Sequence, residues 1–178
     1  MRMDRLLRRR YIVASISCAL VSIALAGGVR AENVKAVAGI VTGNVQQVGF
    51  RAMIQKQAIQ YNLAGSTENN QDKSVHFVLQ GAKDRIKQAL ATIGKGTKKS
   101  SHVKVSTSKT PADSGLKTFT IVGWTSVSRG ISHPYNLVFD LRSDNTTISK
   151  HKAKKVWLKI CEKTVTDGDI GKCAKGDE

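Results

Sequence analysis

Hydrophobic positions along residues 34–124 follow two periods, one typical of helices and one typical of strands. Spacings of three or four residues predict amphipathic helices over residues 50–61 and 82–93. Runs rich in Val, Ile and Phe, some of them alternating with polar residues, predict strands. These strands are expected at residues 34–41, 74–80, 102–108 and 117–124.

Turn residues divide these elements. Asn62 is a plausible end for the first helix, and Gly81 is expected to end the strand over residues 74–80. Residues 63–80 are interpreted as a hairpin, with Asn69 near the end of its first strand. The order is therefore strand, helix, strand, strand, helix, strand, with one extra strand or a split in the last pair. This order predicts an α+β, ferredoxin-like β-α-β-β-α-β fold, in which two helices cover one face of an antiparallel sheet.

Residues 126–178 continue beyond that unit as a C-terminal extension. Alternating large hydrophobic residues predict a half-buried strand over residues 135–142, and a hydrophobic face flanked by lysines predicts an amphipathic helix over residues 148–165. The intervening turn, residues 143–147, can cap this helix. We expect the strand and the helix to dock onto the main domain.

The chain begins with a basic segment followed by an apolar run and small residues, which predicts a signal peptide ending at Ala31. The predicted parts are then a signal peptide (1–31), a domain (32–125) and the extension (126–178), in a periplasmic or secreted protein. The apolar run is close to the lower limit for a membrane-spanning helix, so an uncleaved anchor stays open as an alternative. A lipoprotein modified at Cys18 is a further alternative. After cleavage we expect no stable membrane span.

The cysteine content fits an exported protein, and the net charge indicates that the protein binds anions. The formal net charge is +16, and removal of six arginines and Asp4 with the signal peptide leaves +11. Such a charge favours anionic partners, but aromatic residues make up only 5% of the chain, so nucleic acid is an unlikely partner. Cys161 and Cys173 are an even pair in an oxidising compartment and predict a disulfide, with two free thiols as the alternative. No histidine accompanies them at a spacing that suits zinc. We expect a monomer.

The segment GNVQQVGFR, residues 43–51, leads into the first helix and carries the candidate chemistry. A loop that enters a helix N-terminus presents unpaired N–H groups and the positive end of the helix dipole to an anion. Gly49 lets the backbone approach a ligand, and the guanidinium of Arg51 fits a phosphate group. The alternative is an ordinary strand–helix connection with a surface arginine.

The same residues resemble the signature of the acylphosphatase family, G-x-V-Q-G-V-x-F-R. A second block is similar to the family's G-W-V-x-N…D-G-x-V…G pattern, and it comprises Leu63-Ala64-Gly65, Asn69, Asp72, Val75 and Gly81. The resemblance covers residues 34–124. It implies hydrolysis of the anhydride bond between a carboxylic and a phosphoric acid, without metal or cofactor, on a small acyl phosphate, with inorganic phosphate as a ligand.

Carried over residue by residue, the resemblance implies a phosphate-binding loop and two catalytic side chains. The loop consists of Gln46, Gln47, Val48, Gly49, Phe50 and Arg51. Arg51 would hold phosphate oxygens, and Asn69 would position the attacking water. For Asn69 a purely turn-forming role is the alternative.

Three departures from the family pattern bear on function. Gln47 stands where the loop usually has glycine, and a positive φ there would cost a glutamine about 1–2 kcal/mol. Lys73 replaces a turn glycine, and Ser66-Thr67 replace a large apolar pair. Two hypotheses follow. The first is an exported acylphosphatase-like hydrolase, and the second is a catalytically weak or inactive module of the same fold that binds an anionic ligand or partner.

Overall fold

The computed structural model describes residues 34–165 and Cys173, all within a compact unit that spans residues 32–178. The predicted signal peptide lies outside the described residues. The strands are β1 (Val34–Asn44), β2 (Ala64–Asn69), β3 (Val75–Ala82), β4 (Ser101–Thr110), β5 (Thr118–Ser126) and β6 (Ile131–Asp140). The helices are α1 (Phe50–Tyr61), α2 (Lys83–Lys95) and α3 (Lys150–Thr164), with a short 3₁₀ turn, η1 (Val127–Arg129).

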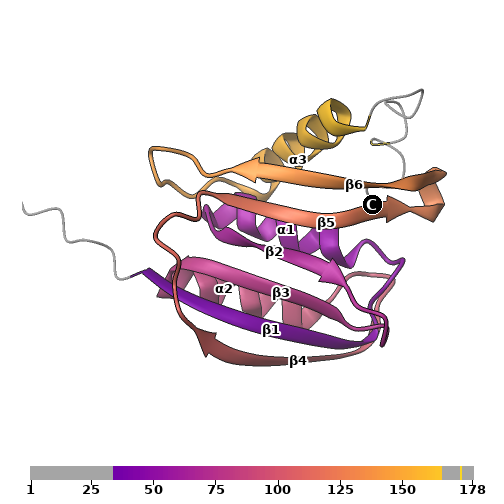
Figure 1. Ribbon diagram of the computed structural model, residues 1–178, viewed down its shortest axis with the longest axis horizontal. Coiled ribbons are helices and arrows are strands. Elements are labelled where there is room, and N and C mark those ends of the chain that lie inside the picture. The colour runs from indigo at the N-terminus through magenta and orange to yellow at the C-terminus, as the bar shows by residue number, and fades with distance from the viewer. Residues whose placement is uncertain (1–33, 166–172, 174–178) are drawn as a thin grey trace, which may run out of the picture. The chain divides into compact units, whose positions relative to one another are not determined.

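These strands form one sheet in the order β4-β1-β3-β2-β5-β6, so the predicted ferredoxin-like, α+β architecture is confirmed (Figure 1). One detail differs from the expectation of an antiparallel sheet, because β5 runs parallel to β2. The reason is topological. β4 pairs with β1 at one edge, and the chain then crosses the sheet and returns in the opposite direction beside β2.

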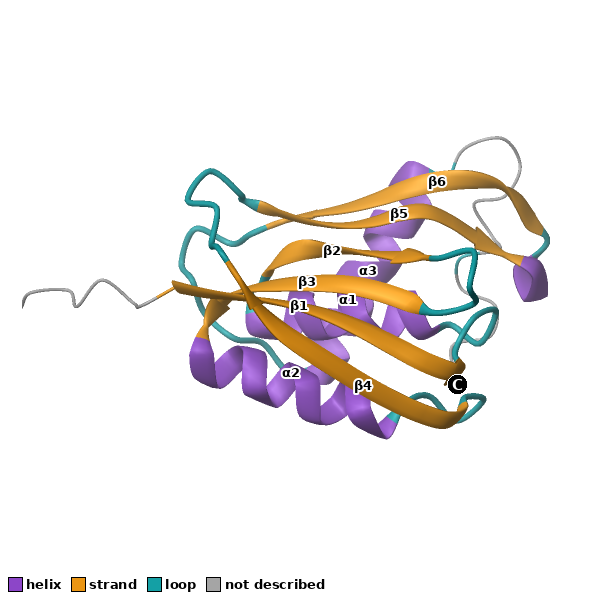
Figure 2. Ribbon diagram, turned by 60° about the horizontal axis from the view of Figure 1, so that its bottom comes forward, coloured by secondary structure: helices purple, strands orange, loops and turns teal. Residues whose placement is uncertain are grey.

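Helices α1 and α2 cover one face of the sheet and leave the other face without helices (Figure 2). The core lies between these layers, where Ile54 of α1 and Ile93 of α2 are fully buried with Leu79 of β3. Phe77 packs over Gly39 on the neighbouring strand, where a Cβ would fall only 2.1 Å from its Cζ. Burial of such side chains is the main force that holds the helices on the sheet.

The C-terminal extension completes this architecture. Strand β6 pairs with β5 at the edge of the sheet, and α3 packs against α1. Trp157 of α3 is fully buried, and its ring meets that of Trp124 edge to face at 5.9 Å. The predicted disulfide is present and joins Cys161 of α3 to Cys173. No helix in the described residues is long and apolar enough to cross a membrane.

Two local expectations were wrong. Gly81 does not end β3 but pairs with Lys35 inside it, and its missing side chain makes room for Leu63, whose Cδ2 lies 2.6 Å from the Cβ position. The cap of α3 is not the turn at residues 143–147. Ser149 caps the helix instead, and its hydroxyl accepts a hydrogen bond from the Lys152 N–H at 3.2 Å.

Candidate phosphate-binding site

The carboxyl ends of three strands meet at one edge of the sheet, at the right of Figure 1. β1 and β2 both run antiparallel to β3, and β5 runs parallel to β2, so these three strands point the same way. The loop after β1 leads directly into α1 at this edge. The topology therefore brings the candidate loop, the last residue of β2 and the end of β5 together.

Helix α1 begins with backbone donors that have no partner in the described chain. Gly49 is its N-cap in the left-handed conformation, with φ 74° and ψ 15°, and no side chain caps the helix. Within the described residues, the backbone N–H groups of residues 46–49 donate no hydrogen bond. The first turn carries no acidic residue that would compete for them. Free donors at the positive end of a helix dipole are a suitable site for a phosphate group.

Gly49 has a backbone conformation that favours glycine. A Cβ at this position would meet nothing within 4 Å, so no neighbouring group of the chain calls for glycine, and the expected close approach to a ligand stays a prediction. The left-handed φ of 74° favours glycine, because L-residues rarely adopt this conformation. The glycine thus sets the direction in which the loop enters the helix.

Hydrogen bonds on both sides hold the loop. The Gln46 amide Nε2 donates to the carbonyl oxygens of Asn70 and Ser74, both at 2.8 Å, and so ties the loop to the β2–β3 turn. On the other side, the Thr97 hydroxyl donates to the Val48 carbonyl oxygen at 3.2 Å. The Gln46 side chain therefore holds the loop in place through hydrogen bonds, a role that the sequence alone did not indicate.

The β2–β3 turn is itself ordered by Asp72. Its Oδ1 accepts hydrogen bonds from the Ser74 hydroxyl at 2.5 Å and from the Ser74 N–H at 2.9 Å. These two bonds, the hydroxyl first, hold the pKa of the Asp72 carboxyl below its ordinary value. The ionised carboxylate thus supports the turn to which Gln46 is attached.

Gln47 adopts a positive φ of 59°, so the loop keeps the conformation that favours glycine although the residue is glutamine. The side chain is exposed and makes no hydrogen bond with the described chain. Lys73, the other residue that replaces a glycine of the family pattern, also has a positive φ of 68°. Both residues therefore keep a left-handed backbone conformation at a cost in conformational strain, and neither moves the backbone out of it.

Arg51 lies in the first turn of α1 and is 8% exposed. Its Nη1 donates to the carbonyl oxygens of Val122 at 2.9 Å and Gly123 at 3.0 Å, on β5. The atoms Nε and Nη2 make no hydrogen bond with the described chain and are not among its buried atoms that lack a partner, so they keep access to solvent. Burial lowers the pKa of Arg51 from its ordinary value. An arginine nevertheless stays cationic in proteins.

Asn69 is the last residue of β2, as the sequence indicated. It pairs with Val75, whose side chain faces the helices, so Asn69 also faces the helix side of the sheet. Within the described residues its side chain makes no hydrogen bond. The parallel register pairs Thr67 with Ile121, so Asn69 and the Gly123 carbonyl that accepts from Arg51 both lie beyond this pair, toward the same end of the sheet. The fold thus brings Asn69, Arg51 and the loop to the same end of the sheet.

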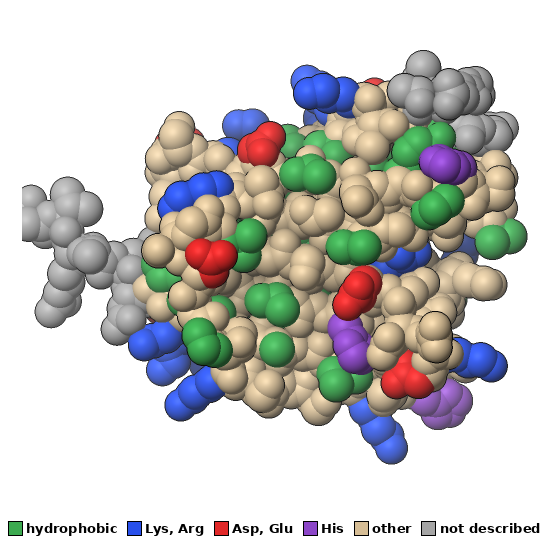
Figure 3. Space-filling view, viewed as in Figure 1, with side chains coloured by type: hydrophobic (Ala, Val, Ile, Leu, Met, Phe, Trp, Pro, Cys, Tyr) green, Lys and Arg blue, Asp and Glu red, His purple; other side chains and the backbone are tan. Residues whose placement is uncertain are grey.

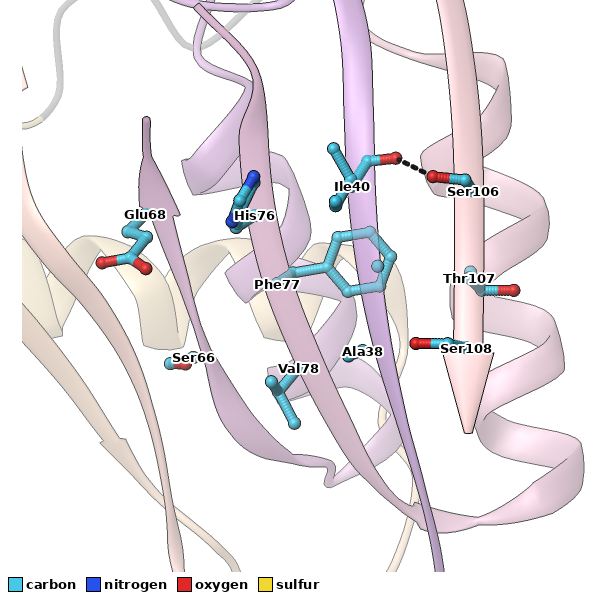
Figure 4. Close-up of a pocket in the computed structure, with 11 residues that line it drawn as sticks. Ala38, Ile40, Ser66, Glu68, His76, Phe77, Val78, Ser106, Thr107 and Ser108 are labelled. Atoms are coloured by element: carbon cyan, nitrogen blue, oxygen red, sulfur yellow. Dashed lines mark hydrogen bonds between the residues drawn. The ribbon is translucent and has the colours of Figure 1, made fainter. Parts of the chain in front are cut away.

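A separate groove of about 390 Å³ lies on the helix-free face of the sheet (Figure 4). Glu68 of β2 and His76 of β3, which are paired across the two strands, lie along it with Ile40 of β1. Neither Arg51 nor Asn69 lines this groove. Figure 3 shows that this face carries mainly uncharged side chains, with lysines and arginines at its rim. The candidate phosphate site and this groove are therefore different surfaces.

The described residues contain no group of three or more His, Cys, Asp and Glu side chains that could hold a metal ion. The site that this α+β fold does assemble is a loop with unpaired backbone N–H groups, a buried arginine and a half-buried amide side chain.

Comparison with known proteins identifies the protein family that this chain resembles. The family model described as Acylphosphatase matches residues 37–121. The acylphosphatase of Bacillus licheniformis is 35% identical over 82 residues, 46% of this chain and 91% of the relative. The acylphosphatase of Koribacter versatilis is 32% identical over 84 residues, 47% of this chain and 76% of the relative. The solved acylphosphatase from Bacillus subtilis is 29% identical, covers 49% of this chain and 98% of its own, and has a TM-score of 0.47.

The chain belongs to the acylphosphatase family, because its residues span nearly the whole length of the Bacillus licheniformis relative. This membership makes the chain an acylphosphatase-like hydrolase, in the class that acts on acid anhydrides. The family match ends at Ile121, before the end of β5, so β6 and α3 lie outside it.

Proposed function

We propose that the protein hydrolyses the carboxyl–phosphate anhydride bond of small acyl phosphates, with the phosphate group held by residues 46–51. The observation that carries this proposal is the row of unpaired N–H groups at residues 46–49 beside the free guanidinium nitrogens of Arg51. Asn69 ends β2 at the same end of the sheet, which supports its assignment to this site. Inorganic phosphate, which is the product, occupies the same donors.

In the reaction, the oxygen of a water molecule attacks the phosphorus atom and the bond from phosphorus to the acyl oxygen breaks. The carboxylate leaves with the bonding electron pair, and the water proton passes to a phosphate oxygen or to solvent. A carboxylate is a good leaving group, so the protein has little proton transfer to assist. The backbone N–H groups and Arg51 stabilise the charge on the equatorial oxygens, and the Asn69 amide orients the water.

Turnover of benzoyl phosphate by the purified protein tests this proposal. Asn69→Ala removes the water-positioning amide, and we expect kcat to fall by about 10² or more, as for the loss of one well-placed polar group in an active site. Asn70→Ala is the matched control, because it removes a neighbouring amide side chain that contacts only His76 among the described residues. The Asn70 carbonyl oxygen, which accepts a hydrogen bond from Gln46, is retained. Equal rates for Asn69→Ala and Asn70→Ala would show that Asn69 has no role in the reaction.

The second candidate is a module of the same fold that binds an anionic partner without turnover. Two observations favour it, the strained Gln47 in the loop and a stripe of lysines on the outer face of α3. The stripe is exposed and consists of Lys152, Lys155, Lys159 and Lys163. Such a module would show no phosphate release from benzoyl phosphate, and its affinity for an anionic partner would fall steeply with salt.

We further propose that the protein is exported to the periplasm or secreted. The N-terminal sequence supports this, and so does the Cys161–Cys173 disulfide, because such bonds persist in oxidising compartments. Mass spectrometry of the protein from its native cells tests the proposal. We expect a mature N-terminus at Glu32, and an intact Met1 together with reduced cysteines would contradict it.

A further inference from the structure

The strand β5 contains a bulge at the point where it holds Arg51. Ile121 pairs with Leu137, and Trp124 pairs with Tyr135, so two residues of β5 stand opposite the single residue Asn136 of β6. The two residues are Val122 and Gly123. Gly123 has a left-handed φ of 58°, and a Cβ there would meet nothing within 4 Å, so glycine is needed for the conformation and not for space. A glycine in this conformation is typical of one class of bulge.

The bulge explains how Arg51 is bound. In a regular strand successive carbonyl groups point to opposite edges, so two neighbouring carbonyl oxygens cannot meet the same donor. Here the carbonyl oxygens of Val122 and Gly123 both accept from one atom, Nη1 of Arg51. The left-handed turn at Gly123 is therefore what points both oxygens toward the guanidinium.

A side chain of β6 closes this bulge. The Asn136 Oδ1 accepts a hydrogen bond from the Gly123 N–H at 2.9 Å. That N–H belongs to the extra residue of the bulge, which the strand ladder leaves unpaired. Asn136 is exposed, and within the described residues its side chain makes no other hydrogen bond. The hydrogen bond to the backbone of Gly123 is therefore the one polar contact of this side chain with the described chain.

We propose that Asn136 is a positioning residue for Arg51, and that the C-terminal extension thereby completes the phosphate site. Asn136 fixes Gly123, the Gly123 and Val122 carbonyl oxygens fix Nη1, and the guanidinium then presents Nε and Nη2 to the phosphate group. This inference rests on the proposed function. It concerns residues beyond Ile121, where the family match ends, so it assigns a role to the part of the chain that the relatives do not explain.

The first test measures the affinity for inorganic phosphate by calorimetry and kcat/KM with benzoyl phosphate. Asn136→Ala removes the acceptor, and we expect both quantities to fall by about 10-fold to 100-fold, because small displacements of a positioning group have such effects. Asn136→Asp keeps an oxygen at the same place and restores most of the loss. Val138→Ala, which shortens another exposed side chain on the same face of β6, is the matched control and leaves both quantities unchanged.

A double-mutant cycle separates positioning from a general loss of structure. If Asn136 acts through Arg51, then Asn136→Ala has no further effect on phosphate affinity in an Arg51→Ala protein. Equal effects of Asn136→Ala with and without Arg51 would overturn the proposal, and so would a phenotype no larger than that of Val138→Ala.

A ligand-free readout keeps the inference separate from the proposed function. In the native protein, the two hydrogen bonds to Nη1 restrict rotation of the Arg51 guanidinium, so its Nη1 and Nη2 groups give distinct signals in ¹⁵N NMR spectra. We expect these signals to merge in Asn136→Ala and to stay distinct in Asn136→Asp and Val138→Ala. If the native protein neither binds phosphate nor releases it from benzoyl phosphate, the proposed function fails, whereas distinct Arg51 signals in Asn136→Ala would refute the positioning role.

Discussion

The strained glutamine in the phosphate loop offers a stability test that does not depend on activity. Gln47 has a φ of 59°, and the left-handed conformation costs an L-residue about 1–2 kcal/mol. Replacement by glycine removes this cost but increases the conformational entropy of the unfolded chain, which opposes the gain by about 0.4–1 kcal/mol. The exposed side chain makes no hydrogen bond with the described chain, so its loss adds little. The net expectation for Gln47→Gly is a stabilisation of about 1 kcal/mol.

Urea unfolding at constant m-value measures this difference, and thermal unfolding should show a rise in Tm of about 2–4 °C for a domain of this size. Gln47→Ala is the matched control, because it removes the same side chain but keeps the Cβ that opposes a positive φ. Lys73→Gly is a second control, with the same relief expected at φ 68° but outside the loop. If Gln47→Ala stabilises the protein as much as Gln47→Gly, then side-chain contacts matter and the backbone argument is refuted.

Three further perturbations test the supports of the site. Gln46→Ala removes two hydrogen bonds, so we expect the free energy of unfolding to fall by about 1–3 kcal/mol and the phosphate affinity to weaken. A variant with native stability and native affinity would show that Gln46 does not support the site. Reduction of the Cys161–Cys173 disulfide should lower stability by up to about 3 kcal/mol without changing turnover, and a lost turnover would link the tail to the site. The pKa of Asp72 is lowered by the Ser74 hydrogen bonds, so its stabilising effect is complete above the unfolded-state pKa of about 3.9 and is lost as the pH falls below it. In Asp72→Asn, urea unfolding between pH 5 and 2 should therefore show a weaker loss of stability than in the native protein, and identical slopes would contradict this.

Local signals predicted the scaffold of the site well. The helical period and the turn residue Asn62 gave α1 its observed bounds, and Asn62 ends the helix in the left-handed conformation with φ 53°. The end of β2 at Asn69 was predicted for a similar reason, because turn-forming residues follow it directly. Both features depend on residues that are neighbours along the chain.

Contacts between distant residues could not be predicted in the same way. Arg51 was expected to hold phosphate oxygens, but the pattern did not indicate that its Nη1 also bonds to carbonyl oxygens 71 and 72 residues further along. Nothing in the strand pattern around Gly123 signals that both oxygens turn toward one donor, because the bulge exists only when β5 is paired with β6. The same holds for Gln46, whose side chain looks like any loop glutamine until the β2–β3 turn folds against it.

Titration of ¹⁵N-labelled protein with inorganic phosphate shows whether the backbone N–H groups of residues 46–51 bind a phosphate group. We expect the largest amide shifts at residues 46–51 and Asn69, and we expect these shifts to saturate together and to disappear in Arg51→Ala. Shifts confined to the lysines of α3, or no saturable shift at the loop, would contradict this expectation.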